Sequence, residues 1–211
     1  PKRYIDFLEA LNCNLCNRSK HAKPEIDFIM QRKDEMSTLT DLIESGKTPV
    51  RVTHNDTKFN NVMIDNKTGE GVCVIDLDTV MQGLSLYDFG DSIRSGTNTA
   101  AEDEKNLDLV SMDENLFESF ADGYLASANH FLVENEIRHL AYAAKLMTLE
   151  CGMRFLTDYL NGDLYFKVEY GEHNLVRART QFKLVKDMEY KMNKLEDIVN
   201  SAVNKHSSYA Y

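Results

Sequence analysis

Five residues of types that can move protons or bind cations lie near one another in the middle of the sequence. Asp56 stands two positions after His54, and Asn61 follows five positions after Asp56. Fifteen residues beyond Asn61, an apolar run ends in Asp76 and Asp78. A buried strand does not normally end in two carboxylates without a reason, because a desolvated carboxylate must be paired or bound to a metal. The spacing therefore predicts a site built from carboxylates and an amide around a cation.

This arrangement is the layout of phosphoryl transfer from a nucleotide. One aspartate on a loop accepts the proton of the attacking hydroxyl, while an asparagine and a strand-end aspartate hold the magnesium ions that bridge the phosphates. The pattern H-x-D-x-x-x-x-N that begins at His54 has the spacing of the protein-kinase catalytic loop. We therefore predict that Asp56 is the base, and that Asn61 and Asp76 hold the Mg²⁺ of bound ATP.

Other residues around this motif have less specific signals. We expect His54 to position the loop by hydrogen bonding rather than to exchange protons. Lys58 could neutralise the transferred phosphoryl group, and an exposed loop lysine is the alternative interpretation. A D-F-G tripeptide begins at Asp88, but it follows a loop and stands 27 residues after Asn61. We assign the metal-binding role to Asp76 and expect Asp88 to be a buried carboxylate that braces the loops of the site.

The elements that must position these residues are short strands within a helical chain. Residues 50–53 are β-prone, and residues 60–64 and 71–75 flank a turn-rich segment, which predicts a hairpin. Only 10 Gly and 3 Pro favour helix elsewhere. Apolar residues at helical spacing predict helices over residues 24–44, 113–132, 137–161 and 175–203. The predicted fold class is α+β, mainly α.

The composition excludes several classes of protein. The 211 residues carry a formal net charge of −10, which argues against a chain that coats nucleic acid or anionic lipid. The sequence contains no apolar run long enough to span a membrane and no secretory leader. We expect a folded cytoplasmic protein with small-molecule partners.

The four cysteines could suggest a zinc site. Cys13 and Cys16 have C-x-x-C spacing and His21 follows, but Cys73 and Cys151 lie far along the chain in apolar contexts. A structural zinc site requires four ligands. Reduced thiols in the cytoplasm are therefore the preferred interpretation.

Two segments resemble a known group of enzymes. The stretch VTHNDTKFNNVMID, followed by VIDLDTV, is similar to the aminoglycoside phosphotransferase and choline kinase superfamily, and most similar to N-acetylhexosamine 1-kinases. That subgroup is also similar in residues 154–163 (RFLTDYLNGD), 165–167 (YFK) and 173–175 (HNL). The whole likeness extends over about residues 25–186. Asn55 stands where the wider superfamily usually has Gly, but the hexosamine-kinase branch carries Asn there.

The resemblance implies an ATP-dependent kinase that phosphorylates a hydroxyl of a small sugar, an N-acetylhexosamine at O1. Asp56 would be the catalytic base that contacts the substrate, and Asn61 and Asp76 would be the Mg²⁺ ligands. Asp78 would orient the substrate or a second metal ion. The fold would be the helical C-terminal lobe of a protein-kinase-like fold, with the hairpin at its active site.

The same resemblance assigns sugar contacts to two residues of the helical part. An Arg and a Tyr contact the sugar in the hexosamine kinases, and Arg154 and Tyr165 fall at the matching places. An arginine fork and a phenol suit hydroxyl and N-acetyl groups. Arg154 could equally pair with a carboxylate on a helix surface.

Kinases of this superfamily have a nucleotide-binding lobe before the catalytic lobe. Residues 1–45 contain no Gly-rich hairpin and no run of strands, and the sequence starts with Pro rather than Met. We expect residues 1–211 to be a single C-terminal lobe that lacks the N-terminal lobe of the same protein, with little activity alone.

Three alternatives remain open at this stage. The acceptor could be an aminoglycoside, choline or another small alcohol, because substrate class is set by helices that diverge quickly. The chain could instead be a catalytically dead binding module of the same fold, although the complete set of Asp56, Asn61 and Asp76 argues against it. A metal-dependent hydrolase is a weaker alternative, because no His cluster accompanies the carboxylates.

Overall fold

The computed structural model describes residues 1–207 and confirms a mainly helical fold with two small antiparallel sheets of two strands each. The chain forms two compact units, each built from separate stretches of sequence. Unit 1 comprises residues 1–41, 99–112 and 148–190, and unit 2 comprises residues 42–98, 113–147 and those from 191 onward. No helix within residues 1–207 is both long and apolar enough to cross a bilayer.

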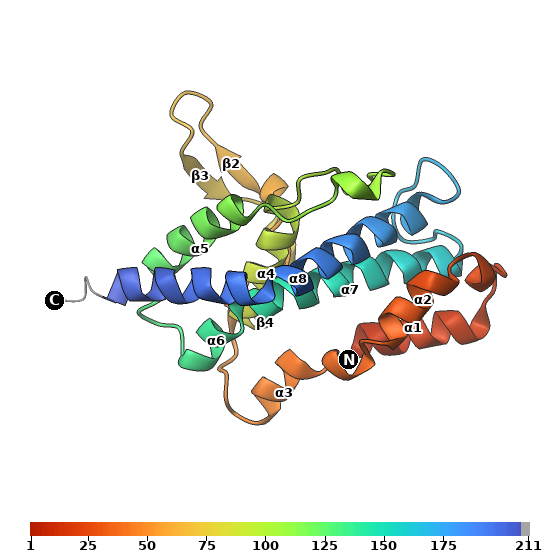
Figure 1. The fold of residues 1–211 in the computed structure, drawn as a ribbon, viewed down its shortest axis with the longest axis horizontal. Coiled ribbons are helices and arrows are strands. Elements are labelled where there is room, and N and C mark those ends of the chain that lie inside the picture. The colour runs from red at the N-terminus through yellow and green to blue at the C-terminus, as the bar shows by residue number, and fades with distance from the viewer. Residues whose placement is uncertain (208–211) are drawn as a thin grey trace. The chain divides into compact units, whose positions relative to one another are not determined.

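Unit 1 is helical. Its core joins the first helices of the chain to parts of two long helices, and Phe28 stacks on Phe182 with ring centroids 4.8 Å apart. The apolar stripe of the last predicted helix is buried as expected, with Leu175 and Val185 each at most 1% exposed. The elements are α1 (Lys2–Cys13), α2 (Lys23–Met30), most of α7 (Leu140–Asn161) and the first half of α8 (His173–Ser207), which Figure 1 labels.

The prediction of one helix over residues 24–44 is wrong. After α2 the chain forms a 3₁₀ turn and then a short helix, α3 (Thr38–Glu44). Arg32 leaves the helical conformation with φ −111° and ψ 14°. Its guanidinium donates to both carboxylate oxygens of Glu189, at 2.8 and 2.7 Å, and to the carbonyl of Phe28 at 3.0 Å. This bidentate pair holds the arginine at the break, and such long-range contacts are not visible in local periodicity.

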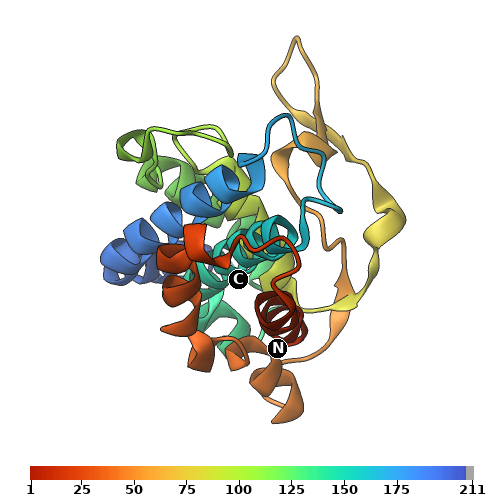
Figure 2. The ribbon, with the colours of Figure 1, turned by 90° about the vertical axis from the view of Figure 1, so that its right-hand side faces the viewer.

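The sheets belong to unit 2. The hairpin is confirmed: β2 (Val62–Ile64) pairs with β3 (Gly71–Val74), and Asp65 at its tip accepts hydrogen bonds from two backbone N–H groups of the turn. The strand expected at residues 50–53 is also present, as β1 (Arg51–Thr53). It pairs with β4 (Met81–Gly83), which was not predicted because three residues ending in Gly carry no alternating pattern. Figure 2 shows both pairs along one edge of this unit, with the hairpin above the β1–β4 pair.

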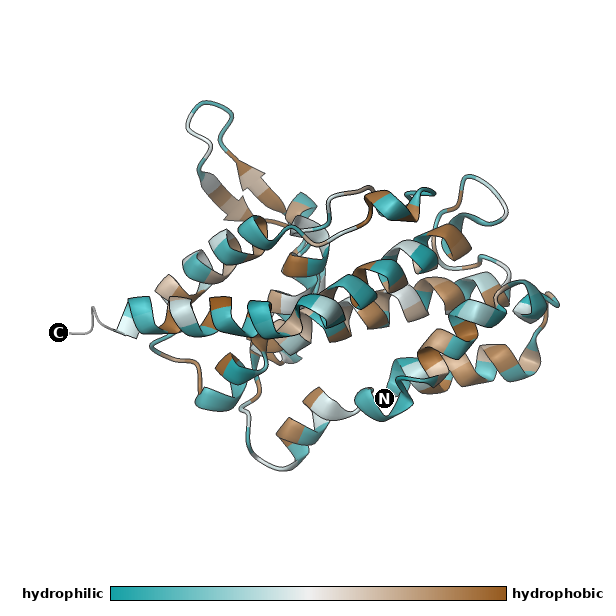
Figure 3. Cartoon of the chain, in the orientation of Figure 1, coloured by the Kyte–Doolittle hydropathy of each residue, from teal (hydrophilic) through white to brown (hydrophobic). Residues whose placement is uncertain are grey.

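The expectation that the strand before Asp76 is buried is wrong. Every residue of β3 is exposed, and Val72 keeps 63% of its accessible surface. In Figure 3 the strands of the hairpin carry brown, hydrophobic stretches, whereas the turn at its tip is teal. The apolar run therefore lies on a surface of unit 2 rather than in its core.

Helices form the rest of unit 2. They are α4 (Ser85–Gly96), α5 (Glu114–Ala128), α6 (Glu134–Arg138), the first turns of α7 and the last part of α8. Phe89 lies edge-on to Phe117 at 6.1 Å in the core. On α5, Leu116 and Phe120 are exposed, whereas Phe117 is buried against Phe89 of α4.

The helix expected over residues 113–132 ends four residues early, at Ala128, whereas α8 covers the whole range expected over residues 175–203. The helix expected over residues 137–161 is divided into α6 and α7, because His139 adopts φ −103° and ψ 5° between them. Its predicted end is confirmed, since α7 ends at Asn161 and Gly162 follows with φ +96°. That positive φ is readily adopted only by Gly, which makes it a typical C-terminal residue.

Candidate active site

The predicted catalytic residues follow β1 in unit 2. Asn55 turns the chain at this point with φ +65°, a conformation that Asn tolerates better than most residues. Its side-chain amide donates to the carbonyls of Thr53 at 3.2 Å and Thr79 at 3.1 Å, so it ties the loop to β1 and to the turn that precedes β4. Asn thus tolerates the backbone conformation of the turn and adds two hydrogen bonds.

Asp88 braces this loop, as predicted. From the first turn of α4, its two carboxylate oxygens accept the backbone N–H groups of His54 at 2.8 Å and Asn55 at 2.7 Å. The hydroxyl of Thr57 donates to the Asp88 carbonyl at 2.6 Å. The carboxylate is half-buried rather than fully buried. The helix thus fixes the backbone on both sides of Asp56.

The carboxylate of Asp56 has one oxygen engaged and one available. Lys58 Nζ donates to Oδ2 at 2.7 Å, and Asn61 Nδ2 donates to the same oxygen at 3.0 Å. In the part of the chain that the structure describes, Oδ1 accepts no hydrogen bond. Burial raises the pKa of Asp56, but the hydrogen bonds and charge of Lys58, together with Asn61, outweigh it and hold the pKa below its ordinary value. The group is therefore ionised at neutral pH and can accept a proton at Oδ1.

His54 joins the loop to the segment that carries Asp76 and Asp78. Its Nε2 lies 2.9 Å from the carbonyl oxygen of Ile75, the residue before Asp76. The hydroxyl of Thr79 donates in return to the His54 carbonyl at 2.6 Å. Because a carbonyl can only accept, Nε2 carries the proton in this contact. The ring thus makes the positioning contact that we expected of it.

Asn61 and Asp76 meet at the base of the hairpin. Asn61 precedes β2, Asp76 follows β3, and the N–H of Ile75 donates to the Asn61 carbonyl at 2.9 Å. The side-chain Nδ2 of Asn61 gives both hydrogens to Asp56, one of them to the backbone carbonyl at 2.8 Å. Its Oδ1 therefore remains as an acceptor. Asp76 takes φ +64° and is exposed, as is Asp78.

This donor set suits a hard cation that is only partly bound by protein. Residues 1–207 contain no group of three or more His, Cys, Asp or Glu side chains placed to hold a metal. Mg²⁺ does not require one, because it keeps several waters and binds one or two carboxylates plus the phosphates of the substrate. An oriented amide oxygen on Asn61 and an exposed carboxylate on Asp76 fit that pattern. The sequence-predicted residues His54, Asp56, Lys58, Asn61 and Asp76 thus form one connected set.

One group that supports the loop was missed by the sequence analysis. Glu136 of α6 is fully buried and accepts two hydrogen bonds of 2.7 Å from Arg51 of β1. It also accepts the hydroxyl of Ser85 at 2.5 Å, next to the start of α4. Burial raises the pKa of Glu136, and the bonds from Arg51 and Ser85 lower it below its ordinary value. The pair is separated by 85 residues, so no local signal could have revealed it.

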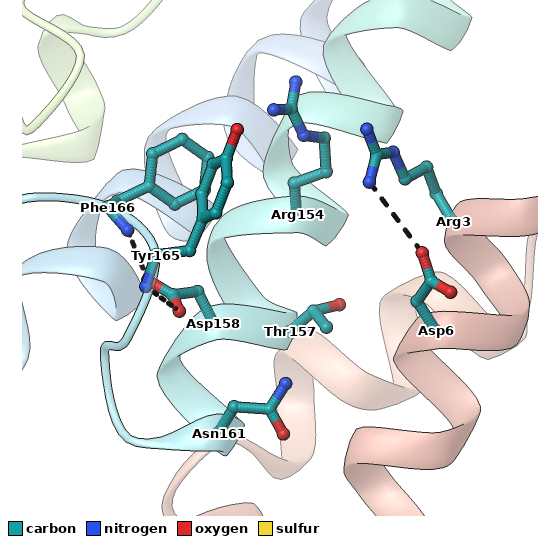
Figure 4. A pocket seen from close by; sticks show the side chains of 8 residues that line it. All are labelled: Arg3, Asp6, Arg154, Thr157, Asp158, Asn161, Tyr165 and Phe166. Carbon is teal, nitrogen blue, oxygen red and sulfur yellow. Dashed lines mark hydrogen bonds and ion pairs between the residues drawn. The ribbon is translucent and has the colours of Figure 1, made fainter.

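Arg154 and Tyr165, the predicted sugar contacts, belong to unit 1 and line one small pocket there. Its volume is about 120 Å³. Figure 4 shows Arg154 between the rings of Tyr165 and Phe166 on one side and the side chain of Arg3 on the other. The remaining lining residues, which we did not predict as site residues, are Arg3, Asp6, Thr157, Asp158, Asn161 and Phe166.

Arg154 differs from the other arginines of the chain. Of the nine, all within residues 1–207, the other eight pair with a carboxylate. Arg154 instead lies over the face of Phe166, at 5.5 Å from the ring centroid. The alternative that Arg154 is a surface salt-bridge partner therefore has no carboxylate to support it among the described residues. Its donors are available to a ligand.

A family model provides an independent comparison for these residues. The model of a phosphotransferase enzyme family, APH, matches residues 5–129. That is more than half of the chain, and it contains the whole connected set from His54 to Asp76 as well as Asp88. The match ends before Arg154 and Tyr165. On this evidence the chain belongs to the phosphotransferase enzyme family.

Proposed function

We propose that this protein is a kinase that transfers the γ-phosphoryl group of ATP to a hydroxyl of a small sugar, an N-acetylhexosamine at O1. The observation that carries the proposal is the carboxylate of Asp56. Oδ2 is held by Lys58 and Asn61, and Oδ1 is left open to a substrate hydroxyl. Family membership supports phosphoryl transfer, and the acceptor rests on the resemblance to hexosamine kinases.

In the proposed reaction the acceptor oxygen forms a bond to the γ-phosphorus while the bond to the bridging oxygen of ADP breaks. The proton of the acceptor hydroxyl passes to Oδ1 of Asp56, which is ionised at neutral pH. Asn61 and Asp76 would hold Mg²⁺, which supplies positive charge to the phosphate oxygens when bound. Lys58 pairs with Asp56 in the free protein. From the same loop it is proposed to neutralise charge on the transferred phosphoryl group.

We assign recognition of the sugar to Arg154 and Tyr165. Within residues 1–207 no carboxylate pairs with the donors of Arg154, and Tyr165 is 75% exposed. The pocket adds the hydroxyl of Thr157 and the amide of Asn161, and such groups pair with sugar hydroxyls and an N-acetyl carbonyl. Asp78 is exposed next to Asp76 and is proposed to orient substrate or a second metal ion.

We also propose that a separate nucleotide-binding lobe of the same protein covers the exposed apolar surface of the hairpin region. Large apolar patches on a soluble protein mark sites of contact. The exposed apolar residues of this surface are Val52, Met63, Ile64, Val72, Val74, Ile75, Leu77, Val80 and Met81. ATP-dependent phosphorylation by residues 1–211 alone tests this part: we expect little turnover, and full-rate turnover would contradict it.

The acceptor is tested with a panel of compounds and γ-labelled ATP, using the full-length protein. We expect label in N-acetylglucosamine or N-acetylgalactosamine, as a phosphate that mild acid releases, since an anomeric phosphate is acid-labile. Transfer only to choline, to an aminoglycoside or to another alcohol would replace the proposed acceptor while leaving the kinase assignment intact. Absence of transfer to every acceptor, with Mg²⁺ and ATP still bound, would favour a binding module.

A further inference from the structure

One carboxylate at the end of α7 binds the loop that carries Tyr165 through three of its backbone N–H groups. Asp158 Oδ1 accepts the backbone N–H groups of Leu164 at 2.9 Å and Tyr165 at 2.8 Å, and Oδ2 accepts that of Phe166 at 2.9 Å. The side chain of Asn174 donates a fourth hydrogen bond, at 2.9 Å. Figure 4 shows Asp158 beneath the two rings, with its bonds to the loop backbone.

This carboxylate occupies a place that helix physics disfavours. Asp158 lies in the last turn of α7, where the partial negative charge of the helix end repels an anion. It is also only 5% exposed, and a buried carboxylate is costly unless hydrogen bonds satisfy it. Both costs are offset by the N–H groups of the loop. Residues that break local rules in this way often serve a site.

The hydrogen bonds of Asp158 set the positions of two pocket walls. Tyr165 and Phe166 are held through their own backbone N–H groups, and the Phe166 ring carries the guanidinium of Arg154. The Phe155 ring lies 4.7 Å from that of Phe166 and supports it from α7. A shift of the loop would therefore move every aromatic contact of Arg154 in this pocket.

A second carboxylate anchors the start of the same loop. Asn174, which is fully buried, donates to Asp163 as well as to Asp158, at 2.9 Å in each case. Arg18 pairs with Asp163 and donates to the carbonyl of Tyr159 at 2.8 Å. The segment from residue 158 to residue 166 is thus fixed at both ends by side chains of unit 1.

We infer that Asp158 is a positioning residue for acceptor recognition: it holds the loop so that Tyr165 and Arg154 present their polar groups to the substrate. The inference rests on the proposed function, which assigns those two residues to the acceptor. Asp158 itself has its oxygens occupied by the loop and is not assigned a contact with substrate.

The test uses Asp158→Asn in the full-length protein, with KM for the sugar, KM for ATP and amide hydrogen exchange of residues 162–168 as readouts. The amide keeps the shape but places a donor against loop N–H groups, so we expect about a tenfold rise in the sugar KM. KM for ATP stays within about twofold, and exchange of the loop accelerates. In a Tyr165→Phe, Arg154→Gln background, Asp158→Asn has little further effect on the sugar KM, as expected for groups that act together.

Asp187→Asn is the matched control. This carboxylate of unit 1 also holds a loop, through the N–H of Met112 at 2.7 Å, but it does not line the pocket. We expect it to change neither the sugar KM nor the exchange of residues 162–168. Should Asp158→Asn fail to fold, Asn174→Ala, which removes one of the four hydrogen bonds, gives the same readouts in the same direction.

Two results would overturn the inference, and they are distinguishable. If Arg154→Gln and Tyr165→Phe raise the sugar KM while Asp158→Asn does not, the acceptor site stands and the positioning role is wrong. If none of the three variants changes the sugar KM, the acceptor site itself is wrong and the inference falls with it. Unchanged hydrogen exchange in Asp158→Asn would also contradict the positioning role, whatever the kinetics.

Discussion

The loop from Thr53 to Asn61 and the segment from Asp76 to Asp78 supply the two halves of the proposed catalytic set in unit 2, but they are built differently. The loop is held at nearly every residue: Asp88 binds two of its N–H groups, and Asp56 is fixed by Lys58 and Asn61. The carboxylates of Asp76 and Asp78 are exposed and, within residues 1–207, pair with nothing.

This difference in support matches the different tasks proposed for a proton acceptor and a cation ligand. A proton acceptor must be in place before the substrate arrives, because even a small displacement of a catalytic group lowers the rate. The hydrogen bonds of the folded chain compensate for the conformational entropy that is lost when this acceptor is ordered. A cation ligand gains its partner only when Mg²⁺ and nucleotide bind, so it can remain solvated until then. The comparison predicts that variants of the loop affect chemistry and stability, and variants of the exposed segment affect metal and nucleotide.

The largest effect is expected from Asp56→Asn. The amide cannot accept the proton of the acceptor hydroxyl, so kcat should fall by about 10³-fold, within the range for loss of general base catalysis. The measurement is steady-state phosphorylation by the full-length protein.

Asp65→Asn, at the exposed tip of the same hairpin region, is the control and should keep kcat within about twofold. Near wild-type turnover by Asp56→Asn would show that the base is assigned to the wrong residue.

A smaller effect is expected from Asp88→Asn. One of the two loop N–H groups would then face an NH₂ donor, which should cost about 1–3 kcal/mol in the free energy of unfolding and lower kcat about tenfold. Chemical denaturation and kinetics on the same preparation measure both.

Asp91→Asn is matched to it, because Asp91 lies one turn along α4 and pairs with Arg94 at 2.9 Å without touching the loop. If both variants lose the same stability and activity, Asp88 has no special role as a brace.

The smallest effect concerns pH. Burial raises the pKa of Asp56, and the amine of Lys58 lowers it. The substitution Lys58→Met removes that amine, so the effect of burial is less opposed. The folded pKa of Asp56 should therefore rise, and the acid limb of kcat/KM should move to higher pH than in the wild type.

The profile is measured over the acidic range in which the variant remains folded by circular dichroism. An acid limb at the same pH in both proteins would mean that Lys58 does not control the charge of Asp56.

The sequence was sufficient for the parts of the site that are local. The spacing from His54 to Asn61 and the position of Asp76 after a strand predicted a set that the hairpin and the β1–β4 pair bring together. It also predicted that Asp88 braces the loop, because Asp76 has the better position for a metal ligand and Asp88 follows a loop 27 residues after Asn61.

It failed where partners are far apart in the chain. The break at Arg32 depends on Glu189, and the support of β1 depends on Glu136, which no periodicity or spacing reveals. The burial of the hairpin was wrong for a related reason: an apolar strand signals that something covers it, but not which part of a protein does so.

Binding of Mg²⁺·ATP to the full-length protein, measured by titration calorimetry, tests the division of work between the two segments most directly. Asp56→Asn should bind Mg²⁺·ATP within about twofold of the wild-type Kd, because it lacks only the proton acceptor. Asp76→Asn should bind at least about tenfold more weakly, because it lacks a charged ligand of the metal. Wild-type affinity in Asp76→Asn, or equal loss in both variants, would contradict the account.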